Sequence, residues 1–154
     1  MACKNWIEYN NNPHHRNVED CVTRALAKVF RRTWSDTYME LAENALETGY
    51  LPNYRHNYNI LLERRDYMRV PLKGTKLTVN QLANLQQHWL GYKPRWAVSI
   101  DGHLTAVVEG KIYDTWDCGR RHVDAIFIPK ADETWIKNEL IKMCEKKGVQ
   151  IKWH

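Results

Sequence analysis

Phenylalanine and long apolar runs are the clearest shortages in this sequence. Two phenylalanines stand beside seven tryptophans and eight tyrosines, so most aromatic rings carry a polar atom and suit a partly wet cleft or an interaction surface. No apolar run approaches the roughly 20 residues of a membrane span. The opening stretch MACKNWIEYNNNPHH also has no apolar signal segment. We therefore expect a cytoplasmic protein without a membrane partner.

The chain also lacks paired cysteines and the motifs of common cofactors. Its four cysteines are far apart, which predicts free thiols rather than a disulfide framework: Cys3, Cys21, Cys118 and Cys144. Cys118 and His122 are four residues apart with Asp117 and Asp124 beside them, but a zinc site normally needs a second ligand pair. Phosphate-binding loops, dinucleotide fingerprints and lipidation motifs are absent. We expect no metal and no cofactor.

Charge of one sign is only mildly in excess. The net charge of +5 and the pI near 9.0 permit an anionic partner without requiring one. Arg31, Arg32 and the C-terminal lysines are explained as helix-end and solvated charges, so we expect no nucleic-acid partner. With 154 residues, 44% of them hydrophobic, and no repeat or linker, the sequence predicts one globular domain over residues 1–154.

Apolar spacing and capping residues predict helices at both ends of the chain. The expected ranges are 21–32, 35–48 with Ser35 as N-cap, 57–66, 78–91 and 133–147. The fourth helix opens with a capping box made by Thr78 and Gln81.

Short strands are predicted between residues 94 and 128. Asp101-Gly102 and Glu109-Gly110 mark two hairpin turns, HVDAIFI forms a further strand, and VQIKW near the C-terminus forms an edge strand. Helices followed by an antiparallel meander make an α+β fold.

Cys21 lies where the first helix is expected to begin. In NVEDCVTRALAKVF the apolar residues recur at helical spacing, and Asp20 is a suitable N-cap. A thiol in the first turn feels the positive end of the helix dipole, which favours the thiolate. The same position also suits an ordinary half-buried cysteine.

The two hairpin turns predict that His103 and Asp114 share a face. Two-residue turns pair Ile100 with His103 and Val108 with Lys111, and this register brings Asp114 diagonally next to His103. Trp116 projects from the same face, whereas Asp117 falls on the opposite one unless a bulge intervenes.

These motifs, EDCVTRALAKVF and GHLTAVVEGKIYDTWD, resemble those of the papain-like cysteine peptidase superfamily, and are similar to its small phage-encoded members. The resemblance implies a papain-like fold in which the helix of Cys21 packs on the C-terminal meander. It also implies roles: Cys21 as nucleophile, His103 as general base and acid, and Asp114 as the group that orients the imidazole. Trp116 would shield the His103–Asp114 contact, and Asp117 is the alternative third member.

One element of the papain pattern is missing. Papain-like enzymes carry a glutamine before the cysteine that helps to form the oxyanion hole, and this chain has PHHRNVEDC there. We expect Asn17 to supply that donor together with the backbone N–H of Cys21, with His15 as the alternative.

The resemblance predicts a cysteine hydrolase that cleaves a peptide or amide bond through a thioester. Its expected partner is a protein or peptide substrate, namely a host protein in the host cytoplasm if the chain is phage-encoded. Two alternatives remain open. One is a peptidoglycan-cleaving amidase or endopeptidase, which the basic pI would suit. The other is a catalytically silent binding protein with the papain fold, which the missing glutamine would suit.

Overall fold

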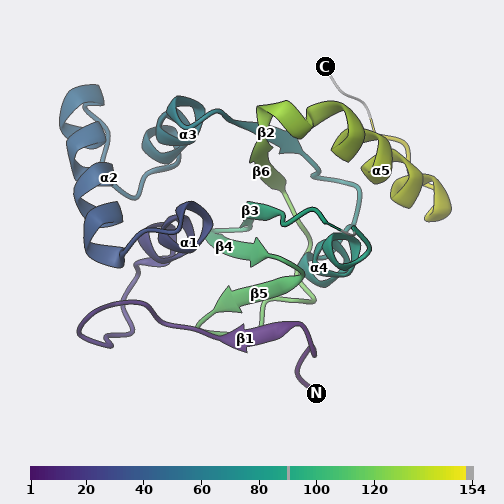
Figure 1. Ribbon diagram of the computed structural model, residues 1–154, viewed down its shortest axis with the longest axis horizontal. Coiled ribbons are helices and arrows are strands. Elements are labelled where there is room, and N and C mark those ends of the chain that lie inside the picture. Colours follow the sequence, from purple (N-terminus) through teal and green to yellow (C-terminus); the bar gives the residue numbers. More distant parts are fainter. Residues whose placement is uncertain (90, 152–154) are drawn as a thin grey trace.

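The computed structural model describes residues 1–89 and 91–151, which form an α+β fold (Figure 1). Six strands make one sheet: β1 (Trp6–Glu8), β2 (Tyr67–Pro71), β3 (Arg95–Ile100), β4 (His103–Val108), β5 (Lys111–Asp114) and β6 (Ala125–Pro129). The helices are α1 (Cys21–Phe30), α2 (Trp34–Thr48), α3 (Arg55–Arg64), α4 (Val79–Gln87) and α5 (Glu133–Lys146), with a 3-10 turn at Lys130–Asp132. Among the described residues, no helix has the length and apolarity needed to cross a membrane.

The strand order is β1-β5-β4-β3-β6-β2. Every pairing is antiparallel except that of β1 with β5, so the sheet is mixed rather than the purely antiparallel meander expected from the sequence. The strands β1 and β2 form its two edges.

Helices cover both faces of this sheet (Figure 1). On one face α1 packs on β4 and β3, α2 packs on α1, and α3 packs on β2 and α2. The fully buried Leu26 and Leu41 belong to this core. On the other face α4 and α5 enclose a second core that contains Trp96 and Leu140. The apolar stripe of α1 therefore fixes Cys21 at the end of the sheet where β4 begins.

The helix boundaries agree with the sequence prediction in most places. The first helix begins at Cys21, and the Thr78–Gln81 capping box is present. The second helix is capped by Thr33 rather than Ser35, because the Thr33 hydroxyl accepts a hydrogen bond from the Asp36 N–H at 3.0 Å. The third helix spans 55–64 rather than 57–66, and the fourth ends at Gln87, before Gly91.

Both edge strands were missed by the sequence pattern, and one expected strand is wrong. Strand β1 has only three residues, too few to show an alternation, and β2 ends in a proline. The predicted edge strand over 149–153 does not form at residues 149–151, and its residues 152 and 153 lie outside the described residues.

The two hairpins have the predicted register. Strands β3 and β4 pair Ile100 with His103, and strands β4 and β5 pair Val108 with Lys111. Glu109 and Gly110 both have positive φ angles, 49° and 82°, which gives the second turn the twist that a two-residue hairpin needs. This register places His103 and Asp114 beside each other at the edge of the α1-covered face.

Candidate active site

Cys21 occupies the first turn of α1 and faces the start of β4. Its half-buried thiol lines one hollow with His103 and Leu104, and it interacts with the imidazole of the first and the backbone N–H of the second. Burial by itself would raise the pKa of this thiol, but those two contacts and the nearby charges of His103 and Arg24 outweigh burial and lower the pKa below its usual value. The surroundings of Cys21 therefore favour the thiolate.

His103 links the thiol to a carboxylate. Its Nε2 lies 2.6 Å from Oδ2 of Asp114, and its side chain is 12% exposed. Burial would lower the pKa of the imidazole, but the hydrogen bonds to Asp114 and Cys21 outweigh burial and raise it to about 9. Both pKa shifts favour the charged forms, a thiolate beside an imidazolium.

Trp116, predicted to shield the His103–Asp114 contact, lies against the imidazole of His103. Its ring centroid lies 5.0 Å from that of His103, with a tilt of 52°. The guanidinium of Arg121 lies 5.4 Å above the Trp116 ring on the solvent side of the site. Trp116 itself is 37% exposed, whereas the side chain of His103 beneath it is 12% exposed.

Asp114 is held by several groups besides His103. Its Oδ1 accepts hydrogen bonds from the Thr115 N–H at 2.8 Å and from the Arg24 guanidinium at 3.1 Å. Burial would raise the pKa of this carboxyl, but the hydrogen bond and charge of His103, followed by Thr105 and Arg24, lower it. Asp114 therefore stays ionised and presents Oδ2 to the imidazole.

Sequence reasoning missed the role of Arg24. Its buried guanidinium forms ion pairs with Asp20 and with Asp114 and so joins the start of α1 to the end of β5. Asp20 does not cap α1 through its side chain, as the sequence suggested, because that carboxylate binds Arg24 and accepts a hydrogen bond from Trp34 Nε1 at 2.9 Å. The spacing of Asp20 and Arg24, four apart beside an apolar stripe, was the available signal.

The N-terminal strand fixes the main chain of Asp114. The carbonyl oxygen of Asp114 accepts hydrogen bonds from the Trp6 indole N–H at 3.1 Å and from the Tyr9 N–H at 2.8 Å. Both groups of Asp114, the carbonyl and the carboxylate, are therefore immobilised.

Asn17 lines the hollow in front of the thiol, as its predicted role requires. It is exposed, and it lies on the segment that leads into α1. The Cys21 N–H belongs to the first turn of α1, where backbone donors have no partner within the helix. Asn17 and the first turn of α1 therefore border the same hollow.

Asp117 does not serve as the third member. Its Oδ2 accepts a hydrogen bond from the Cys3 N–H at 2.7 Å, and its Oδ1 accepts one from the Gly119 N–H at 3.0 Å. These contacts tie the N-terminus to the turn after β5, on the side away from His103. Asp117 lies three residues beyond the end of β5, whereas His103 contacts Asp114, the last residue of that strand.

The cysteine–histidine pair considered for a metal is not brought together. Cys118 is fully buried, whereas His122 is exposed. Instead, ligand atoms of His103, Asp114 and Cys118 lie within 4.8 Å of one another. Burial and the charge of Asp114 raise the pKa of Cys118 to about 12, so this thiol is a neutral neighbour that lies 3.7 Å from Asp114.

No family model, curated protein or solved structure matches this chain. The chemistry that the site can perform therefore follows from its own geometry.

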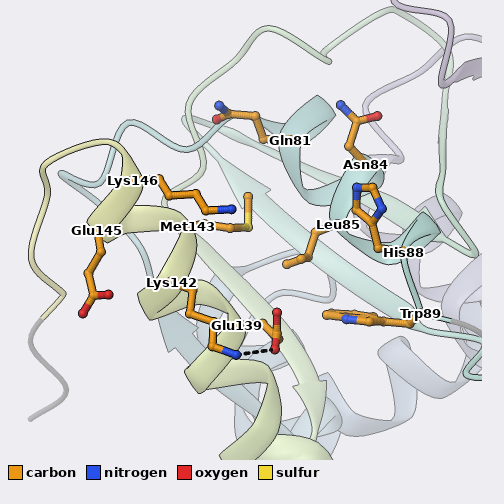
Figure 2. A pocket seen from close by; sticks show the side chains of 10 residues that line it. All are labelled: Gln81, Asn84, Leu85, His88, Trp89, Glu139, Lys142, Met143, Glu145 and Lys146. Carbon is orange, nitrogen blue, oxygen red and sulfur yellow. Dashed lines mark hydrogen bonds and ion pairs between the residues drawn. The ribbon is translucent and has the colours of Figure 1, made fainter.

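A second large hollow lies between α4 and α5 on the other face of the sheet (Figure 2). It measures about 710 Å³, and its apolar wall consists of Leu85, Trp89 and Met143. Figure 2 shows the ion pair of Glu139 with Lys142, 3.3 Å long, on its rim. Because its lining includes no thiol, this hollow lacks the nucleophile that distinguishes the Cys21 site.

Proposed function

We propose that the protein is a cysteine hydrolase of the papain-like type, which cleaves a peptide or amide bond through a thioester. The observation that supports this most directly is the continuous contact from Cys21 through His103 to Asp114, with 2.6 Å between the last two. Cys21, His103 and Asp114 follow each other in the chain, and their side chains lie in the same order in space, which supports these roles.

Each residue has a chemical task in this proposal. The Cys21 thiolate attacks the carbonyl carbon, while its own N–H and Asn17 bind the developing oxyanion. His103 then gives its proton to the leaving nitrogen, and it later takes a proton from the water that hydrolyses the thioester. Asp114 holds the ring in position and stabilises the imidazolium.

The first test of the proposal is the pH dependence of alkylation by iodoacetamide, measured for each cysteine by peptide mass spectrometry. At pH 7 we expect Cys21 to react clearly faster than Cys3, because the pKa of the Cys21 thiol is lowered whereas burial and Asp117 raise that of Cys3. In His103→Ala this advantage disappears, and in the matched variant His88→Ala, on the far face, it remains. Equal reactivity of Cys21 and Cys3 in the parent protein would exclude a preformed ion pair.

Acyl transfer is tested with p-nitrophenyl acetate and intact mass spectrometry. The parent protein should take up one acetyl group on Cys21 and release it again, whereas Cys21→Ala should take up none. A protein that alkylates rapidly but never acetylates would favour the silent binding protein. Zymography on purified peptidoglycan then separates a wall-cleaving enzyme from one that acts on a host protein.

A further inference from the structure

The hollow at the thiol continues past His103 into a second one. The first measures about 740 Å³ and is lined by Cys21 and His103 together. The second measures about 590 Å³ and is lined by His103 and Trp116, whereas Cys21 belongs to the lining of the first alone. Since the hairpin turn 100–103 borders both hollows, the imidazole stands at the boundary between them.

The direction in which His103 passes its proton indicates that the leaving group occupies the second hollow. When the thiolate has added to the carbonyl carbon, His103 donates its proton to the amide nitrogen, and the carbon–nitrogen bond breaks. The acyl group stays on the sulfur of Cys21, and the amine departs on the side of the imidazole. The part of the substrate that carries this nitrogen therefore extends from His103 away from Cys21.

Three consecutive basic residues line this second hollow: Arg120, Arg121 and His122. The Arg120 guanidinium donates a hydrogen bond to the carbonyl oxygen of Met1 at 2.7 Å, and the Arg121 guanidinium lies over the ring of Trp116. Both of these partners are uncharged. Both guanidinium groups therefore bring positive charge to the hollow, and the charge of Arg120 also acts on the carboxylate of Asp117, whose pKa it helps to lower.

Two carboxylates, Asp101 and Asp124, border both hollows and so lie near the boundary marked by His103. They suit the departing amine, which becomes cationic when it takes up a second proton from water. They would repel a substrate carboxylate at the same place. A carboxylate in the second hollow is therefore best placed farther from the scissile nitrogen, toward the arginines.

We propose that the leaving group of this hydrolase carries a carboxylate beyond the scissile nitrogen, past Asp101 and Asp124, and that Arg120 and Arg121 bind it. This proposal rests on the cysteine hydrolase function proposed above. Guanidinium groups bind carboxylates through paired, charge-assisted hydrogen bonds. A free C-terminus and an acidic side chain offer the same chemistry, so the test distinguishes them.

The test uses three affinity labels that alkylate Cys21: iodoacetyl-Gly-Gly, its C-terminal amide, and iodoacetyl-Gly-Asp amide. A favourable charge contact should make one or both carboxylate labels react roughly five to ten times faster than the uncharged amide. The label with the larger advantage identifies the source of the carboxylate. In Arg120→Ala/Arg121→Ala the ratio should fall to about one.

Two further variants show whether the ratio depends on these arginines in particular. Lys142→Ala/Lys146→Ala removes two positive charges from α5 on the far face and should keep the ratio of the parent protein. Arg120→Ala alone leaves Arg121 on Trp116 and should give an intermediate ratio. Equal rates for all three labels, or a ratio that survives the loss of both arginines, would overturn the proposal.

Plain iodoacetamide, run in the same series, separates the failure of one proposal from the failure of both. If Cys21 is no faster than Cys3 with this reagent, the hydrolase function itself fails. If Cys21 is fast but the labels do not differ, only the assignment of the leaving group fails.

Discussion

Arg24 holds two carboxylates of the candidate site in place, a role that its position in the sequence does not indicate. Its side chain is 5% exposed and lies between two carboxylates whose side chains are 6% and 1% exposed, those of Asp20 and Asp114. Buried charges are tolerated only when they are paired, so each of the three depends on the others. Arg24 also adds a positive charge near the thiol of Cys21. This charge lowers the pKa of the thiol, as the larger effects of His103 and Leu104 do, whereas burial raises it.

Replacing Arg24 by glutamine should therefore destabilise the fold by about 3–5 kcal/mol, because it leaves two buried carboxylates without their cation. Urea denaturation followed by tryptophan fluorescence measures this loss. The control is Lys142→Ala, which breaks an exposed pair and should cost under about 1 kcal/mol. A loss in Arg24→Gln no larger than in the control would show that the network contributes little to stability.

Asp114→Asn should lower the pKa of His103, which is about 9 in the parent protein. The folded-state value lies above the usual 6.5, so the protonated imidazole stabilises the fold fully below about pH 6.5, and this contribution is lost as the pH rises through about 9. The stability difference between parent and variant should accordingly shrink over that window. NMR titration of the imidazole and denaturation at several pH values check both effects, and an unchanged His103 pKa in the variant would contradict them.

At the scale of elements, the two tight turns around β4 decide whether the site forms. A slip of one residue in either hairpin would move His103 or Asp114 to the opposite face. The turns differ in their surroundings. A Cβ at Gly102 meets nothing within 4 Å, whereas a Cβ at Gly110 would lie 2.3 Å from the Gln87 side chain.

Both glycines have positive φ, so alanine at either position should cost about 1–2 kcal/mol. Gly110→Ala should cost about 1–3 kcal/mol more than Gly102→Ala, because it also overpacks against Gln87. The Gln87 amide cannot move freely, since it donates hydrogen bonds to Asn5 and to the Gly110 carbonyl. Thermal denaturation of the pair measures the difference, and equal losses would show that Gln87 adapts at no cost.

The sequence predicted the parts of the site that depend on local rules. The hairpin register follows from the residues of the turns themselves, and the start of α1 follows from the apolar spacing after Cys21. The role of Arg24 and the strand β1 were not predicted, because both contact Asp114, which is distant in the chain, and no local sequence pattern indicates such a contact. The cap of α2 was misplaced by two residues, because Thr33 and Ser35 are equally suitable by type.

On the scale of the whole molecule, one sheet serves two cores. Leu26 is fully buried on the face covered by α1, and Cys144 is fully buried on the face covered by α4 and α5. Strands β3, β4 and β6 contribute side chains to both cores, so the loss of one core removes the support of the other. The α+β class was predictable from the order of the elements. The mixed character of the sheet was not, because it depends on the parallel pairing of β1 with β5, two strands that are far apart in the sequence.

Leu26→Ala should lower the free energy of unfolding by about 2–5 kcal/mol. If the two faces unfold together, the free energy for labelling the Cys144 thiol on the opposite face falls by the same amount. Thiol labelling across a denaturant series, compared with global denaturation, measures both quantities. If the free energy for labelling Cys144 is the same in Leu26→Ala as in the parent protein, the two faces unfold separately.

The hydrogen bond from the Trp6 indole to the Asp114 carbonyl spans 108 positions in the chain. During synthesis the first strand leaves the ribosome long before its partner in the sheet exists, and the thiol of Cys21 emerges well ahead of its histidine and its acid. A nascent chain therefore carries Cys21 without these neighbours until translation has passed residue 114. The contact between His103 and Asp114, and with it the environment that lowers the pKa of the thiol, forms only after that point.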